Sequence, residues 1–505
     1  MRNAMVLSSL VLLLEFRALA VDSPPGAESI PNFSARTNPA IEPVDLLPGP
    51  HLFVDDYLIA ASANLTKTTH HPERYEGNPI LGREQGTTQP YVSVVRDPDT
   101  NLFRMWYNRG KGEECALAYA ESDDGIHWRT PSLGILGNDN RLLLVGYGAA
   151  VIDEGPTFPE KSRRFKLAYW DRVKRGMNIG FSPDGLHWTL WEANPVLADF
   201  SEEQFLQDPR RPYGVGDVID VYWDSFRKRY GAFVKTPAVQ SDGYSMAPRA
   251  KNYIRRLVSA IYSDDFVHWT QPQRVIVPEP RDPGQLEFYA AGGTIIRGQL
   301  LLGFVRMLHD DYACEPGGPT DGIGYTTLVT SRDGTHFDRH DDIFFDRSPI
   351  PAAWDRAMTW IGSSLLLGDE VFFYYGGYKR GHKVEPTTER QLGLARMPRD
   401  RYVSRDARKD KIARLVTVPF KSDSLLGKYL VLNTNAREGK VRVRLLDERG
   451  NPIEGADFKD SQVVVGDGLA LPVTGLDLSK AGAHPFKIEF ELDAAELFGF
   501  DVCSK

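Results

Sequence analysis

Cysteine is almost absent from this sequence. Its 505 residues include only Cys115, Cys314 and Cys503. An odd and sparse set of cysteines does not make a disulfide framework, even in an exported protein. One bridge could form, but the sequence does not say which cysteines it would join. No group of cysteine and histidine residues has the spacing of a zinc site, so we expect no metal centre of that kind.

The sequence also lacks an excess of positive charge and, after its first 20 residues, any long apolar run. Lys and Arg number 60 against 68 Asp and Glu, which gives a net charge of −8. Nucleic-acid binding usually calls for a basic face, so nucleic acid is not an expected partner. A membrane-spanning helix takes about 20 apolar residues, so no membrane span is expected either. The many Gly, Pro, Trp and Tyr residues favour a turn-rich, all-β protein.

Residues 1–20 have the pattern of a secretory signal peptide. Arg2 supplies a positive start, Ala4–Leu14 is an uncharged apolar core, and Ala18-Leu19-Ala20 is a small-residue cleavage site. The apolar core is too short to cross a bilayer. We therefore expect a secreted or periplasmic protein.

One pattern, S-x-D-G-x-H-W or a close variant, recurs four times at intervals of roughly 60 to 80 residues. Asp-Gly between two apolar strands is a strong hairpin signal, because Gly accepts the positive φ of a tight turn. The Ser and Asp side chains can accept hydrogen bonds from the turn's backbone. Each copy is therefore predicted to be a structural hairpin joining the outer two strands of a repeated β unit. The copies are Ser122–Trp128, Ser182–Trp188, Ser263–Trp269 and Ser331–Phe337.

The strand pattern predicts a fifth unit at residues 354–404, although the Asp-Gly hairpin is missing there. Five such units predict a five-bladed β-propeller. The isolated strand His51–Ile59 is predicted to close the ring against the last unit.

After about residue 410 the sequence changes to short alternating strands, such as Val441–Leu445 and Phe486–Leu492. Such strands, separated by turns, predict a small β-sandwich. The predicted order is a signal peptide at 1–20, a flexible lead-in at 21–48, the propeller at 49–410 and the sandwich at 411–505.

This layout resembles the five-bladed propeller glycoside hydrolases of families 32, 43 and 68, and most of all secreted bacterial proteins of the family-32- or family-43-like kind. The hairpins, Arg96-Asp97-Pro98, the opening segment Leu52–Asp56 and the C-terminal sandwich carry the resemblance, which spans nearly the whole mature chain. It implies activity on carbohydrates.

The catalytic motifs of family 32 are matched less well than its architecture. The W-M-N-D-P-N-G motif is absent, and Gln89 stands where the related families place their first carboxylate. Asp97 falls in a turn at the far end of its strand. Glu114-Cys115 does not stand at the start of an inner strand, as the family's acid motif does.

Acids just before or at the start of the inner strands are the candidates for catalysis. Glycoside hydrolysis needs two carboxyl groups flanking one bond, and the starts of inner strands meet at one mouth of a propeller. Glu287 is predicted to be the proton donor because the neighbouring aromatic residues would raise its pKa. Asp217 or Asp355 is predicted to be the base or nucleophile, with Arg356 keeping Asp355 ionised.

Four further residues are predicted to contact the substrate: Asp220, Arg306, His309 and Arg356. No cofactor is expected, although a structural calcium ion is compatible with the sequence.

The predicted function is a secreted glycoside hydrolase that cleaves a poly- or oligosaccharide. Two alternatives stay open. The first is a non-catalytic propeller that binds glycans or proteins, which a single channel acid would favour. The second is a polysaccharide lyase on the same fold, which would use a Tyr or His base.

The mature protein is predicted to begin near Val21 and to be soluble outside the cytoplasm, because the cleavage site follows a short apolar core. N-terminal sequencing of exported protein tests this. An intact Met1 on a membrane-bound product would contradict it.

Overall fold

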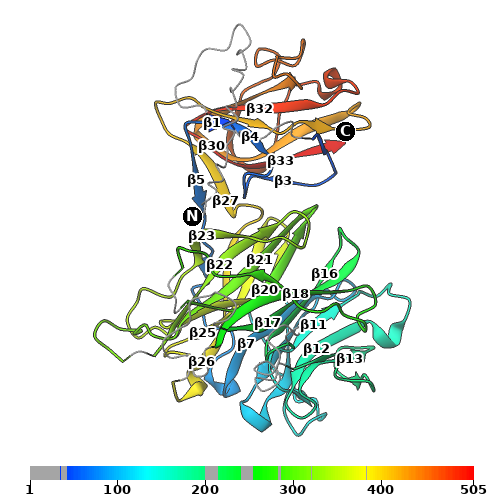
Figure 1. Ribbon diagram of the computed structural model, residues 1–505, viewed down its shortest axis with the longest axis vertical. Helices are drawn as coiled ribbons and strands as arrows, with labels where there is room; N and C mark the ends of the chain where they lie inside the picture. Colours follow the sequence, from blue (N-terminus) through cyan, green and yellow to red (C-terminus); the bar gives the residue numbers. More distant parts are fainter. Residues whose placement is uncertain are drawn as a thin grey trace, which may run out of the picture.

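The computed structural model describes residues 34–35, 42–199, 214–239, 254–282, 286–319, 321–382 and 384–504, and these form two β-rich bodies stacked along the long axis (Figure 1). This confirms the all-β class. The described helices are short 3₁₀ turns: Arg83–Gln85, Gly112–Glu114, Lys161–Arg163, Thr387–Glu389 and Leu478–Ala481. None of them is long and apolar enough to span a membrane. All three cysteines are free thiols.

The larger body consists of five antiparallel units of about four strands each. Units four and five share one sheet, because Gly324 and Met358 form a parallel bridge. The first two units contain β7 (Thr88–Arg96), β8 (Phe103–Arg109), β9 (Ala116–Ser122), β10 (Arg141–Leu144), then β11 (Ala150–Asp153), β12 (Phe165–Asp171), β13 (Gly176–Ser182), β14 (Thr189–Leu190) and β15 (Leu197–Ala198). The other three contain β16 (Ile219–Asp224), β17 (Arg229–Val239), β18 (Ile254–Ser263), β19 (Gln273–Ile276), then β20 (Leu286–Arg297), β21 (Leu300–His309), β22 (Ile323–Ser331), β23 (Asp338–Phe345), then β24 (Met358–Leu367), β25 (Glu370–Tyr378), β26 (Arg390–Pro398) and β6 (Glu73–Arg74).

The first strands of the five units contact one another in a closed order. β7 contacts β11, β11 contacts β16, β16 contacts β20, β20 contacts β24, and β24 contacts β7. The residues at the starts of these strands are therefore drawn toward a common region.

The four repeated hairpins are structural, as predicted. In the first, Ser122 Oγ accepts a hydrogen bond from the Gly125 N–H at 2.9 Å, and Asp124 Oδ1 accepts from the N–H groups of Ile126 and His127, both at 2.8 Å. The His127 ring contacts the other Asp124 oxygen at 2.7 Å. The same bonds recur in the other three copies, which also join the outer strands of their units. The histidines are thus held in the turns.

The hairpins also connect neighbouring units. Trp106 of unit one donates to the Gly185 carbonyl of unit two at 2.7 Å. Tyr374 of unit five donates to the Gly125 carbonyl of unit one at 2.9 Å. Tyr262 of unit three donates to Gly334 of unit four at 2.5 Å. Each bond satisfies a buried aromatic donor with a turn carbonyl of the next unit.

The prediction that His51–Ile59 closes the ring is wrong. β3 (His51–Leu52) pairs with β33 of the second body instead. The outer strand of unit five is β6, which pairs with β26 through Arg74 and Ala395. Phe53 packs in the core of the second body, and an alternating pattern does not reveal which sheet receives it.

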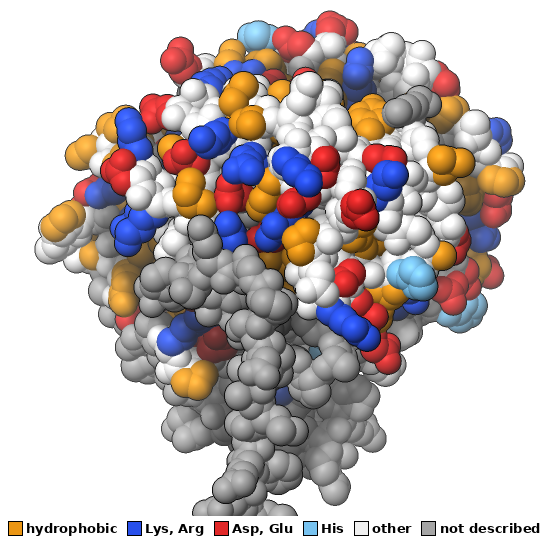
Figure 2. Space-filling view, turned by 90° about the horizontal axis from the view of Figure 1, so that it is seen from above, with side chains coloured by type: hydrophobic (Ala, Val, Ile, Leu, Met, Phe, Trp, Pro, Cys, Tyr) orange, Lys and Arg blue, Asp and Glu red, His pale blue; other side chains and the backbone are white. Residues whose placement is uncertain are grey.

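The second body is a twelve-stranded sheet system built from both ends of the chain, and it forms the upper part of Figure 1. Its core includes buried Phe53, Phe420, Phe490 and Phe500. Seen from above, its described surface mixes basic and acidic side chains rather than showing a field of one sign (Figure 2). Its strands are β1 (Ser34–Ala35), β2 (Val44–Asp45), β3, β4 (Ile59–Ala63), β5 (Leu65–Thr69), β27 (Val403–Ala407), β28 (Ala413–Thr417), β29 (Phe420–Lys421), β30 (Lys428–Asp447), β31 (Val464–Pro472), β32 (Phe486–Asp493) and β33 (Glu496–Ser504).

The close fit of a hairpin glycine against the neighbouring unit predicts a measurable loss of stability on Gly185→Ala. Gly185 has φ +77° and its added Cβ would lie 2.6 Å from the Trp106 ring. Gly134→Ala is the matched control, because Gly134 has φ +67° and no atom within 4 Å of an added Cβ. Positive φ costs both variants about 1–2 kcal/mol, and overpacking costs Gly185→Ala about 1–3 kcal/mol more. Equal losses in denaturant unfolding would contradict this.

Candidate functional site

A cavity of about 220 Å³ lies where the first strands of the units begin. Its lining mixes four tyrosines with one carboxylate and several basic or neutral polar groups. The lining residues are Gln89, Tyr91, Lys111, Tyr147, Asp217, Tyr289, Tyr378, His382, Thr387 and Arg390. Aromatic faces beside a few polar groups suit the recognition of a small polar ligand such as a sugar.

Asp217 is the one carboxylate among the described residues that line this cavity. It precedes β16 and forms an ion pair with Lys235 of β17. Burial alone would raise the pKa of Asp217, but the charge and hydrogen bond of Lys235 outweigh it and hold the pKa below its ordinary value. Asp217 is therefore ionised at neutral pH.

Glu287 lies outside the cavity lining, in the second position of β20 and two residues before the lining residue Tyr289, and has the opposite electrostatic character. Its side chain is 5% exposed and forms an ion pair with Arg256 of β18. Burial raises the pKa of Glu287, and the negative charge of Asp310 adds to the rise, so that the attraction of Arg256 only partly offsets them. Arg256 also lies 3.6 Å from Asp310.

The two ion pairs meet at the ring of Tyr289. Lys235 Nζ lies 4.6 Å and Arg256 Cζ lies 5.3 Å from the centre of that ring. Arg256 also lowers the pKa of Asp217, and Lys235 that of Glu287. The structure therefore joins Asp217 and Glu287, two of the predicted catalytic residues, in one electrostatic network.

Asp220 and Arg306, two of the predicted substrate-binding residues, form a second pair. Arg306 donates to Asp220 at 3.4 Å and to the Ile361 carbonyl at 2.9 Å, and its Cζ lies 5.7 Å from the centre of the Tyr91 ring. Burial raises the pKa of Asp220 to about 7. A Cβ on Gly292 would lie 2.1 Å from the Asp220 carboxylate, so only glycine fits beside this acid.

Asp355 and Arg356 point to separate partners outside the cavity lining. The Asp355 carboxylate accepts from Arg74 at 2.8 Å and from the Tyr375 hydroxyl at 3.1 Å, and its side chain is 2% exposed. Arg356 instead binds both oxygens of Glu315. Arg356 does not form the expected pair with Asp355, and the catalytic role of Asp355 stays a prediction without a place in this cavity.

His309 also lies outside the cavity lining. It ends β21, stacks on Tyr312 with ring centres 4.3 Å apart, and contacts the Tyr325 hydroxyl at 3.4 Å. Burial lowers its pKa. Its substrate contact stays a prediction.

The residues of the site that sequence reasoning missed are Lys111, Tyr147, Lys235, Arg256, Tyr378, Thr387 and Arg390. Lys235 and Arg256 stand within strands that are largely buried, and a charge in such a place is costly unless it is paired. That pattern is a usable signal for buried ion pairs, although it does not name the partner.

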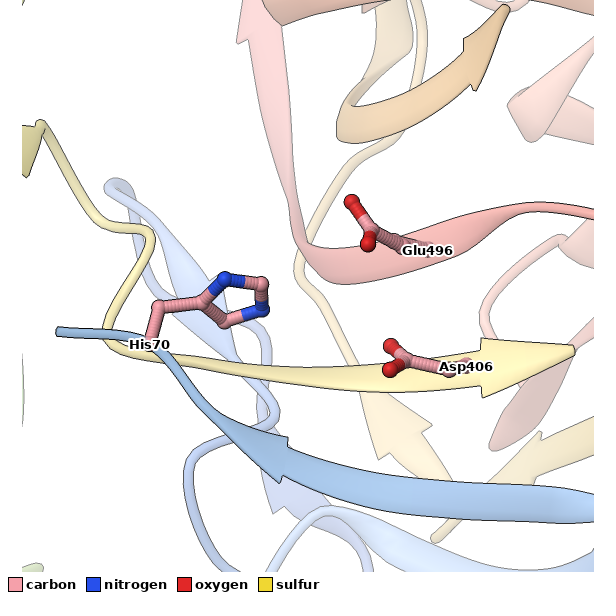
Figure 3. Close-up of side chains that lie close together, drawn as sticks. All are labelled: His70, Asp406 and Glu496. Carbon is pink, nitrogen blue, oxygen red and sulfur yellow. The ribbon is translucent and has the colours of Figure 1, made fainter. Parts of the chain in front are cut away.

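A second group of polar side chains lies at the junction of the two bodies. Atoms of His70, Asp406 and Glu496 lie within 4.8 Å of one another and face one another (Figure 3). Such a set could hold a divalent ion. Asp406 also accepts a hydrogen bond from Ser404 at 2.5 Å, and Glu496 accepts one from Asn435 at 3.0 Å. These bonds account for the arrangement without an ion.

Comparison with known proteins gives structural likeness alone. No family profile and no curated sequence matches the chain. Many of the similar solved structures are glycoside hydrolases. A glycosyl hydrolase from Bacteroides ovatus is 14% identical, with 66% of this chain and 95% of that chain covered and a TM-score of 0.41. A structure from work on family-130 enzymes that target β-1,2-mannosidic linkages in Candida mannan is 14% identical, with 66% and 95% covered and a TM-score of 0.40.

A third similar structure is the family-32 β-fructofuranosidase of Bombyx mori. The two chains are 11% identical, the matched region covers 86% of this chain and 94% of that chain, and the TM-score is 0.38. TM-scores this low do not bear on the chemistry of this chain, so its function has to be inferred from the residues of its own cavity.

Proposed function

We propose that the five units form a five-bladed β-propeller, that the second body is a β-sandwich, and that the protein is a secreted glycoside hydrolase. The closed order of contacts among the first strands supports the propeller. The position of the cavity at the starts of those strands supports a site at the mouth of its central channel.

One observation carries the activity: two carboxylates in one network have pKa values displaced in opposite directions. Asp217 is held ionised beside Lys235, and Glu287 is shifted toward its protonated form by burial. When the pKa values of two carboxyl groups differ in this way, the group with the lower pKa is suited to act as base and the group with the higher pKa as acid. A glycosidase needs one carboxyl group to protonate the leaving oxygen and one to act as base or nucleophile.

In this proposal Glu287 protonates the departing sugar oxygen and Asp217 attacks the sugar or activates a water. The four tyrosines of the lining give the cavity apolar surface against which a sugar can pack. Arg256 and Lys235 position the two carboxylates and stabilise negative charge as the proton leaves Glu287. The substrate is a poly- or oligosaccharide outside the cytoplasm.

A lyase remains the second candidate, because Tyr91, Tyr147, Tyr289 and Tyr378 all line the cavity and a lyase could use a tyrosine base. Burial raises the pKa of Tyr91 well above its ordinary value and that of Tyr378 to about 12. A tyrosine with a raised pKa is a poor base at neutral pH, so hydrolysis is favoured. The single carboxylate in the lining is the observation that supports the binding-only alternative, because Glu287, the second acid of the proposed pair, lies outside that lining.

Reducing-end release from a panel of polysaccharides tests the proposal. Glu287→Gln and Asp217→Asn should each slow cleavage roughly 10²–10⁴-fold, the usual worth of a catalytic acid or base. Glu315→Gln is the control, because this acid lies outside the cavity and binds Arg356. Full activity of Glu287→Gln, or products with an unsaturated sugar end, would contradict hydrolysis by this pair.

A further inference from the structure

Arg390 places a positive charge in the cavity that no described carboxylate neutralises by an ion pair. It begins β26 and lies with its Cζ 4.5 Å from the centre of the Tyr378 ring. Its guanidinium donates to Gln89 Oε1 at 2.9 Å and to the His382 backbone carbonyl. Both acceptors are neutral, and the one carboxylate that acts on Arg390 from a greater distance, Glu385, is exposed to solvent.

The neutral side chain of Gln89 leaves Arg390 without an ion pair at this contact. It is 5% exposed, lies on the first strand of unit one, and uses its amide N–H₂ to donate to the Gly110 carbonyl at 3.3 Å. A carboxylate in its place would neutralise Arg390 and lose that donor. An unpaired, partly buried cation is costly, and an anionic ligand would remove the cost.

The remaining cations separate into an inner and an outer group. The inner pair, Lys235 and Arg256, is already bound to Asp217 and Glu287. At the outer edge, Lys111 pairs with Glu385, but both side chains are more than half exposed, and such a pair is weak. Lys111 is therefore the second strongly basic side chain, after Arg390, among the described residues that line the cavity.

We propose that the site binds an anionic sugar, whose carboxylate or sulfate group contacts Arg390 and Lys111. This names the substrate class of the proposed hydrolase and rests on that function. A uronate carboxylate matches the planar guanidinium fork in two parallel hydrogen bonds. The whole chain carries a net charge of −8, so attraction of an acidic glycan has to come from this local cation set rather than from the overall charge.

Binding measurements by calorimetry test the proposal independently of cleavage. The probes are galacturonate trimer, galactose trimer as its neutral counterpart, and a sulfated galactose trimer, each with the intact protein. The acidic probes should bind more tightly than the neutral one, and their affinity should fall as salt is raised. A preference for the galacturonate trimer over the sulfated trimer identifies the carboxylate as the source.

Substitutions then locate the contact. Arg390→Gln should weaken binding of the acidic trimer about 10- to 100-fold, the worth of a charge-assisted hydrogen bond. Lys111→Gln should weaken it a few-fold, about the worth of an exposed ion pair, and the fold should be retained because this side chain is more than half exposed. Gln89→Glu should also weaken acidic binding by neutralising Arg390. Arg83→Gln is the matched control, because this exposed arginine pairs with Glu389 outside the cavity.

The outcomes separate this inference from the proposed hydrolysis. Binding of only the neutral trimer, of none of the probes, or equal binding by Lys111→Gln, Arg390→Gln and Arg83→Gln overturns the inference, even if a neutral polysaccharide is cleaved. Arg390-dependent binding of an acidic trimer without release of reducing ends from any acidic polysaccharide leaves the inference standing and contradicts the hydrolase.

Discussion

Hydrogen bonds from buried aromatic side chains to the hairpin of the next unit join three pairs of neighbouring units, and the order of the units depends on them. Trp106, Tyr262 and Tyr374 each span a boundary between units in this way. The turn carbonyl is available because glycine allows the hairpin its positive φ. With the outer ends of the units held in this order, their first strands meet at the inside, and the site is assembled from residues that lie far apart in the sequence.

The site itself is organised by partly buried positive charge. Lys235 and Arg256 extend from neighbouring strands toward Tyr289 and each holds one carboxylate. Removing a charge partner from such a pair leaves the other buried and unpaired, which is costly. The arrangement therefore fixes the position of both acids while giving them different protonation behaviour, and Arg390 adds a charge that is left for a ligand.

The repeated hairpins could be predicted from the sequence because a local pattern specifies a local turn. Asp217 and Glu287 could also be selected from the local sequence, since each stands at the start of an apolar strand. The position of Asp355 relative to the cavity could not, because its partner Arg74 comes from a strand that joins the last unit from the other end of the chain. Likewise, nothing near His51 in the sequence indicates that it pairs with β33 rather than with the ring.

The dependence of kcat/KM on pH tests the central claim most directly, because it reports the ionisation of the free enzyme's acid and base. If Asp217 acts ionised, activity is lost as the pH falls through its pKa, which lies below the ordinary value of 3.8. If Glu287 acts protonated, activity is lost as the pH rises through its pKa, which lies above 4.5. The account predicts a bell-shaped profile whose alkaline limb disappears in Glu287→Gln. A profile that rises with pH and has no alkaline limb in the wild-type protein would contradict it.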